Sequence, residues 1–86
     1  MTVRLTADGT IELDGICSIE DAEILQQHLL TSPLAIVDWR SCVQAHTAVI
    51  QVLMASQASL RGPPAGDFLR MQVDPVMRAT RDGVAP

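Results

Sequence analysis

The chain has 86 residues, a formal net charge of −4 and a hydrophobic content of 48%. This length and composition predict a single small globular domain over residues 1–86 with an aliphatic core, because Trp39 and Phe68 are the only aromatic residues. The negative charge argues against binding to nucleic acid or to anionic membranes, since both require a basic surface.

The first predicted element is a β-hairpin. Residues 2–6 and 10–14 alternate apolar and polar side chains, as half-buried strands do, and Asp8-Gly9 between them is a strong turn signal. Gly15 is expected to end the second strand. The alternation places four apolar side chains on one face of the hairpin: Val3, Leu5, Ile11 and Leu13.

A helix is predicted next, over residues 19–31. Ser18 and Asp21 have the spacing of a capping box with a shortened acid, and acidic residues crowd the first turn. The helix should end near Thr31, because Ser32 precedes Pro33 and is disfavoured in the helical region. Its expected buried stripe follows helical spacing: Ile19, Ala22, Leu25 and Leu29, with Leu30 beside them.

Residues 34–37 are a continuous apolar run, which is typical of a central parallel strand buried on both faces. A strand, a helix and a strand in this order predict a right-handed βαβ crossover. The polar residues that follow, up to His46, are expected to form a short loop.

A second helix is predicted over residues 47–60, with the hydroxyl of Thr47 at its start as an ordinary N-terminal cap. This helix is apolar nearly all round, so it needs either a partner protein or a third helix of the same chain to cover its second face. One side carries Ala48, Val52 and Ala55, and another carries Ile50, Met54 and Ala58.

The tail begins with a break at residues 62–66, which are rich in Gly and Pro. A helix broken near Asp74 is favoured over residues 67–80, although residues 68–73 also alternate as a strand would. The last residues, 81–86, are expected to fray. The predicted fold is α/β: a small mixed sheet, made of the hairpin and one central parallel strand, packed with two to three helices.

Targeting signals are not expected. No segment has the roughly 18 apolar residues of a membrane span, and Arg4 and Asp8 interrupt the N-terminus where a signal peptide would be apolar. We therefore expect a cytoplasmic protein with no membrane span, in which Cys17 and Cys42 are reduced thiols. No Cys-x-x-Cys pair occurs, so neither a metal nor another cofactor is expected.

Asp38 at the end of the buried strand and Thr47 nine residues later, opening an apolar helix, carry a family resemblance. The chain resembles the STAS domain, the module of bacterial anti-sigma-factor antagonists and of sulfate-transporter tails. The likeness covers about residues 3–60 and is most specific over 36–54. Where the family motif reads Asp-Ser-(Ser/Ala)-Gly, this chain reads His46-Thr47-Ala48-Val49.

The resemblance implies a non-enzymatic interaction module in bacterial signalling. Its partner would be an anti-sigma or histidine-kinase-like regulator, bound through the N-terminal end of the second helix, and Thr47 would be the phosphoacceptor candidate. A phosphate there adds nearly two negative charges at the contact surface. The expected partner-binding residues are Asp38, Trp39, Arg40, His46, Ala48, Ile50, Gln51 and Met54.

Alternatives remain at this point. Trp39 beside Arg40 is typical of an interface contact pair, but a Trp is equally common as the cover of a sheet edge. The apolar second helix could instead drive homodimerisation. The alternative function is that of a small thiol-based enzyme or redox protein using Cys17, Cys42 and His46, because a Cys before a helix N-terminus can have a lowered pKa.

Overall fold

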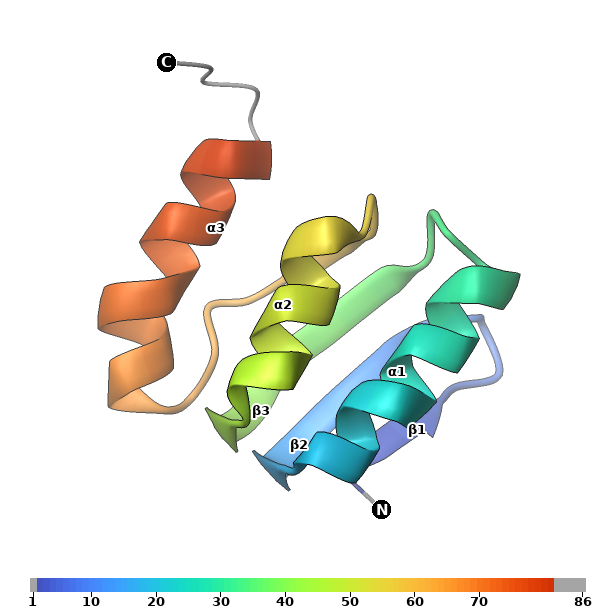
Figure 1. The fold of residues 1–86 in the computed structure, drawn as a ribbon, viewed down its shortest axis with the longest axis horizontal. Helices are drawn as coiled ribbons and strands as arrows, with labels where there is room; N and C mark the ends of the chain where they lie inside the picture. The colour runs from blue at the N-terminus through green and yellow to red at the C-terminus, as the bar shows by residue number, and fades with distance from the viewer. Residues whose placement is uncertain (1, 82–86) are drawn as a thin grey trace.

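The computed structural model describes residues 2–81, which form a mixed sheet with helices packed against it (Figure 1). The four strands are β1 (Val3–Leu5), β2 (Ile11–Cys17), β3 (Ile36–Ala45) and β4 (Ser59–Arg61), and their order in the sheet is β1-β2-β3-β4. β1 is antiparallel to β2, whereas β3 runs parallel to both β2 and β4. The prediction of a small α/β fold with a mixed sheet is confirmed.

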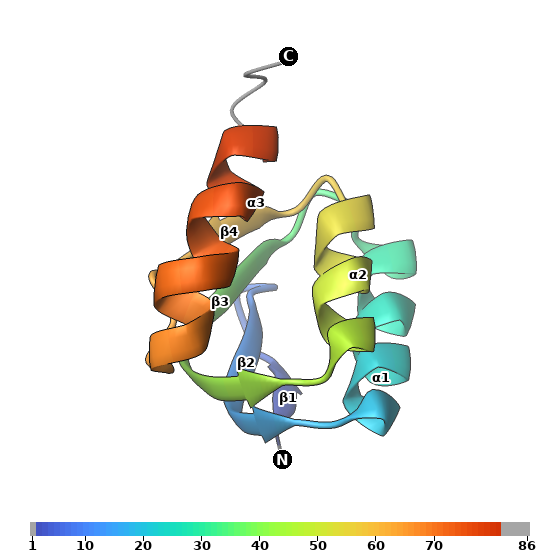
Figure 2. The same cartoon turned by 60° about the vertical axis from the view of Figure 1, so that its left-hand side comes forward.

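The helices are α1 (Ile19–Thr31), α2 (Thr47–Ala55), the π-helical turn η1 (Leu69–Val73) and α3 (Asp74–Arg81). α1 and α2 lie side by side on one face of the sheet, and α3 lies on the far side of α2 from α1 (Figure 1, Figure 2). None of the helices described in residues 2–81 is long and apolar enough to cross a membrane.

The N-terminal hairpin forms as predicted, with Val3 opposite Leu13 and Leu5 opposite Ile11. Val3, Ile11 and Leu13 are buried, but Leu5 is 54% exposed, because it ends a three-residue strand at the edge of the sheet. The prediction that Gly15 ends the second strand is wrong. β2 passes through Gly15 at a φ of +68° and continues to Cys17, with register shifts on both sides of this glycine.

α1 has the predicted bounds and the predicted capping box. The Ser18 backbone N–H donates to Asp21 Oδ2 at 2.7 Å, and the Asp21 N–H donates to Ser18 Oγ at 3.4 Å. Ala22, Leu25 and Leu29 are buried as expected. Ile19 and Leu30 are exposed, so the predicted stripe is wider than the face that the helix buries.

β3 extends through the residues that were predicted to form a loop, and that prediction is wrong. Val37 and Trp39 are buried, while Asp38 and Arg40 alternate with them and so belong to the opposite face of the strand. This alternation is a strand pattern. It is hard to recognise in the sequence because the polar residues that follow resemble a loop.

α2 ends at Ala55, and the last part of the predicted 47–60 helix is wrong. After a short turn, in which the Ser56 N–H donates to the Leu53 carbonyl at 3.2 Å, the chain forms β4 and pairs with β3, so that Leu60 lies opposite Val37. The sheet therefore gains a fourth strand. α2 buries Val49 and Leu53, which lie between its two predicted apolar faces.

The tail is helical, as favoured. The predicted break at Asp74 is a widened π turn, in which the Asp74 N–H donates to the Leu69 carbonyl, and the helix continues through Pro75. A wider turn gives a proline ring room that a regular turn lacks. Leu69 and Met77 join the core with Trp39. Of the residues expected to fray, 82–86 lie outside the described residues.

Candidate docking site

The N-terminus of α2 is capped by His46 and not by Thr47. The His46 Nδ1 atom accepts the Ala48 N–H at 3.0 Å, and the His46 carbonyl accepts the Val49 N–H at 2.9 Å. Thr47 is therefore the first residue of the helix, and its side chain is exposed. The prediction that Thr47 caps the helix is wrong, but an exposed hydroxyl at a helix N-terminus is still compatible with phosphorylation.

The N-termini of α1 and α2 are joined through the end of β2. The His46 backbone N–H donates to the Cys17 carbonyl at 2.9 Å, and Ser18, the next residue along, caps α1. Burial raises the pKa of the nearby Asp21, but hydrogen bonds from Thr2 and Ser18 outweigh it, so the pKa lies below its usual range. Asp21 is therefore a charged acceptor that holds the start of α1 in place.

A groove of about 580 Å³ lies at the carboxyl ends of β2 and β3, beside the starts of α1 and α2. Grooves at the carboxyl ends of parallel strands are common binding sites in α/β folds. We call it the docking groove. Its lining residues come from β2, α1, β3, the N-cap of α2 and the start of the C-terminal helix: Ile16, Cys17, Ser18, Ile19, Val43, Gln44, Ala45, His46, Phe68 and Leu69.

Large apolar side chains surround this groove and remain open to solvent. Ile16 is 64% exposed, Ile19 56%, Val43 49% and Phe68 69%. A cluster of exposed apolar side chains beside a groove is typical of a surface that binds another molecule. The docking groove is therefore the candidate functional site among residues 2–81.

These four residues are not among those predicted from the sequence to bind a partner. Ile19 was expected in the core, and Phe68 was expected only in the helical tail. Val43 projects outward at an irregularity, because Gly15 pairs with Cys42 whereas Ile16 pairs with Gln44, so β3 has one extra residue here. Gly66 lies against this bulge, since a Cβ atom at Gly66 would lie 1.8 Å from the Val43 carbonyl oxygen.

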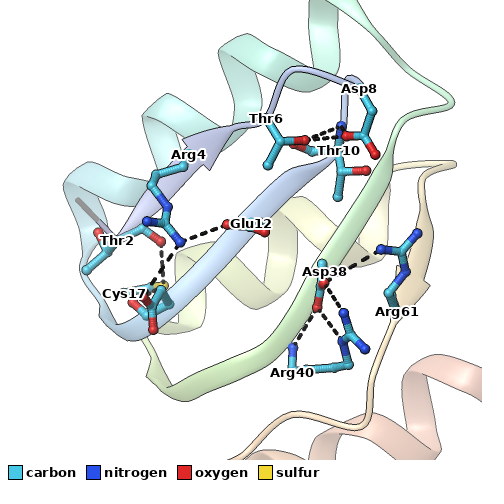
Figure 3. Close-up of polar contacts among 11 residues, drawn as sticks. Thr2, Arg4, Thr6, Asp8, Thr10, Glu12, Cys17, Asp38, Arg40 and Arg61 are labelled. Carbon is cyan, nitrogen blue, oxygen red and sulfur yellow. Dashed lines mark hydrogen bonds and ion pairs between the residues drawn. The ribbon is translucent and has the colours of Figure 1, made fainter.

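Asp38, Trp39 and Arg40 do not join the docking groove. Asp38 lies on the face of the sheet opposite to Trp39, where its carboxylate accepts Arg40 Nε at 3.0 Å and Arg40 Nη2 at 2.8 Å (Figure 3). Arg61 of β4 lies 3.8 Å from the same carboxylate. The hydrogen bonds from Arg40 hold the pKa of Asp38 below its usual range, although burial opposes them.

Trp39 is fully buried, and its prediction as a partner contact is wrong. Its indole packs so closely on Gly62 that a Cβ atom there would lie 2.6 Å from Trp39 Nε1. Among the described residues, Trp39 has the largest of the fully buried side chains, and it belongs to the hydrophobic core. Arg40 is exposed on the opposite face, so the two residues do not form a joint surface.

The other predicted contacts lie along α2. Ala48 and Gln51 line a shallow second groove of about 510 Å³ between α1 and α2. Met54 is 47% exposed, and Ile50 is half-buried against the core. The structure thus brings His46 to the docking groove and leaves Ala48, Gln51 and Met54 on the adjacent surface of the helix.

The cysteines and His46 of the alternative function also lie close to one another. Cys17 and His46 both line the docking groove, and Cys17 Sγ lies 4.0 Å from Cys42 Sγ. Both thiols are free. Within residues 2–81, no group of three or more His, Cys, Asp or Glu side chains is placed to hold a metal ion.

No protein-family model matches the chain, and no curated protein or solved structure is significantly similar to it. The case for a function therefore depends on the geometry of the site.

Proposed function

We propose that this protein is a non-enzymatic interaction module that binds a protein partner through the docking groove and the exposed N-terminal part of α2. The observation that carries the proposal is the set of exposed apolar side chains around the groove, led by Ile16 and Phe68. Burying such side chains in an interface would contribute about 25 cal/mol for each Å² of apolar surface removed from water.

The STAS resemblance supports a more specific form of the proposal. The partner is then an anti-sigma or histidine-kinase-like regulator in a bacterial cytoplasm, and the protein acts by competing for it. Phosphorylation of Thr47 would release the partner, because the helix N-terminus tolerates the added charge whereas an apolar contact surface does not. Thr47 stands one residue from His46, which lines the groove, so the charge would appear at its margin.

The test is an NMR titration of the isotope-labelled protein with a histidine-kinase-like regulator, first alone and then with ATP. We expect shifts and broadening in the docking groove and over residues 46–54, and a further downfield shift of the Thr47 amide once ATP is added. Perturbation confined to the opposite face of the sheet, around Asp38, would contradict the proposed surface.

Matched substitutions sharpen the test. Phe68→Gln removes a large apolar side chain that lines the groove, and Leu34→Gln makes a comparable change at a side chain 74% exposed before β3, at the opposite end of that strand from the groove. We expect Phe68→Gln to weaken partner binding at least tenfold, which corresponds to about 1.4 kcal/mol, and Leu34→Gln to leave it unchanged. Equal effects of the two variants would argue against a specific docking groove.

A further inference from the structure

The two cysteines form a buried pair beside the docking groove, which Cys17 lines. Cys17 ends β2 and Cys42 lies on the neighbouring strand β3, and both side chains are almost completely enclosed. Their sulfur atoms are 4.0 Å apart. This separation is about 2 Å more than the length of a disulfide bond, so a modest local movement would join them.

The two thiols are not equivalent. Cys17 is among the residues that line the docking groove and Cys42 is not, so Cys17 is the nearer of the two to the groove. The Cys42 thiol lowers the pKa of Cys17 by hydrogen bonding, against the opposing effects of burial and of the Asp21 carboxylate. The hydrogen bond with Cys17 and burial both raise the pKa of Cys42. Its position at the groove therefore makes Cys17 the candidate for the thiol that meets an oxidant first.

We propose that Cys17 and Cys42 are a redox-sensitive modification site, at which a hydroperoxide converts the two thiols into an intramolecular disulfide. The Cys17 thiolate attacks the O–O bond of hydrogen peroxide, forming a sulfenic acid and releasing hydroxide, which takes up the Cys17 proton as water. The Cys42 sulfur then attacks the sulfenic sulfur. An S–S bond forms, the S–O bond breaks, and the oxygen leaves as a second water carrying the Cys42 proton.

The backbone around the pair can accommodate this movement. The ladder between β2 and β3 is already irregular between Gly15 and Ile16, and Gly15 has a φ of +68°. Moving Cys17 would also disturb both helix N-termini, because its carbonyl accepts the His46 N–H and its neighbour Ser18 caps α1. Oxidation would thus reshape the docking groove. The effect of that change on partner binding, unlike the disulfide itself, rests on the proposed function.

The first experiment needs no partner protein. The folded protein is treated with hydrogen peroxide, unfolded, exposed to iodoacetamide and weighed by mass spectrometry. We expect a monomeric chain that is lighter than the reduced chain by two hydrogens and that iodoacetamide does not alkylate. Treatment with dithiothreitol should regenerate both free thiols. A chain that remains doubly alkylated, or disulfides that join two chains, would overturn the proposal.

The order of events is tested with dimedone, which traps sulfenic acids. In partly oxidised wild-type protein, peptide mapping should place dimedone on Cys17, and in Cys42→Ala the labelling of Cys17 should persist. Cys42 in Cys17→Ala should be labelled at least about tenfold more slowly than Cys17 in Cys42→Ala, because Cys42 lies farther from the groove. Circular dichroism shows whether both variants are folded. If either is not, the wild-type mapping alone decides which thiol reacts first. Dimedone mainly on Cys42 would refute Cys17 as the first thiol.

The consequence for the groove is measured separately. The oxidised protein should show displaced amide signals for Ser18 and His46, and it should bind the regulator at least tenfold more weakly than the reduced protein. If the disulfide forms but binding is unchanged, the redox effect on docking is refuted and the proposed function stands. If the reduced protein also fails to bind, the proposed function fails while the disulfide stands.

Discussion

Asp38 offers a sharp test of how the face of the sheet opposite to Trp39 is stabilised. Its side chain is only 11% exposed, and its carboxylate accepts the Arg40 backbone N–H at 3.1 Å in addition to the Arg40 side chain. Asp38→Asn keeps the shape of the side chain but removes the charge. The side chain of its partner Arg40 is 58% exposed, so water compensates for part of the lost ion pair.

The expected loss of stability at pH 7 is about 1 to 2 kcal/mol, because the backbone hydrogen bond keeps only a neutral acceptor and the solvent-screened ion pair is lost. Because the pKa of Asp38 is lowered in the folded protein, the contribution of its charge is present above the ordinary pKa of 3.8. That contribution is lost as the pH falls through the folded-state pKa. The difference between wild type and Asp38→Asn should therefore shrink toward zero in acid.

Trp39 provides the assay, because it is the only tryptophan of the chain and is fully buried. Urea unfolding followed by its fluorescence at pH 7 and at pH 2.5 measures both effects, and the midpoint should fall by roughly 1 M at pH 7. Asp67→Asn is the matched control: Asp67 also pairs with an Arg, but its side chain is 85% exposed, so little change is expected. A difference between wild type and Asp38→Asn that is the same at both pH values would refute the reasoning.

Three further predictions concern stability and use the same urea assay. His46→Ala should destabilise the protein by about 1 kcal/mol through loss of the α2 cap, and His46→Asp should recover that loss, since Asp is a preferred N-cap; equal losses would contradict the capping role. Leu13→Ala should cost about 2 to 5 kcal/mol, whereas Leu5→Ala should cost less than about 1 kcal/mol because Leu5 is half exposed. Gly66→Ala should cost about 2 kcal/mol or more, because its Cβ would overlap a backbone carbonyl oxygen of β3; Gly9→Ala, which meets no atom within 4 Å but has a φ of +87°, should cost about 1 kcal/mol. A larger loss for Gly9→Ala than for Gly66→Ala would show that close packing at the bulge is unimportant.

Local signals in the sequence were enough for the elements that depend on neighbouring residues. The Asp8-Gly9 turn was enough to predict the hairpin. Ser18 and Ser32, the residue before Pro33, were enough to predict the two ends of α1. Strand β4 was missed because it has three residues and is defined by its pairing with β3. The helical spacing of apolar residues in α2 continues to Ala58, so the first residues of β4 were predicted to be part of that helix.

The candidate site was only partly predictable for the same reason. His46 was recognised as a residue of the surface, since it stands at the start of an apolar helix. Ile16 and Val43 reach the surface only because the β2–β3 ladder slips by one residue, and no local pattern predicts that slip. Trp39 was misjudged because burial of a side chain next to two polar residues depends on which face of the strand the helices cover.

The order of the strands in the sheet is also their order along the chain. Each strand can therefore dock beside its predecessor as it leaves the ribosome, and no strand has to insert between two that are already paired. The two parallel pairings nevertheless close long segments of chain, since Ile11 lies opposite Val37 and Val37 lies opposite Leu60, and such non-local pairings slow folding. The segment after α2 contains β4, which covers the edge of β3, together with Leu69 and Met77 of the core. A chain without the residues from Ser59 onward would present that edge uncovered, and an uncovered strand edge favours strand-to-strand aggregation.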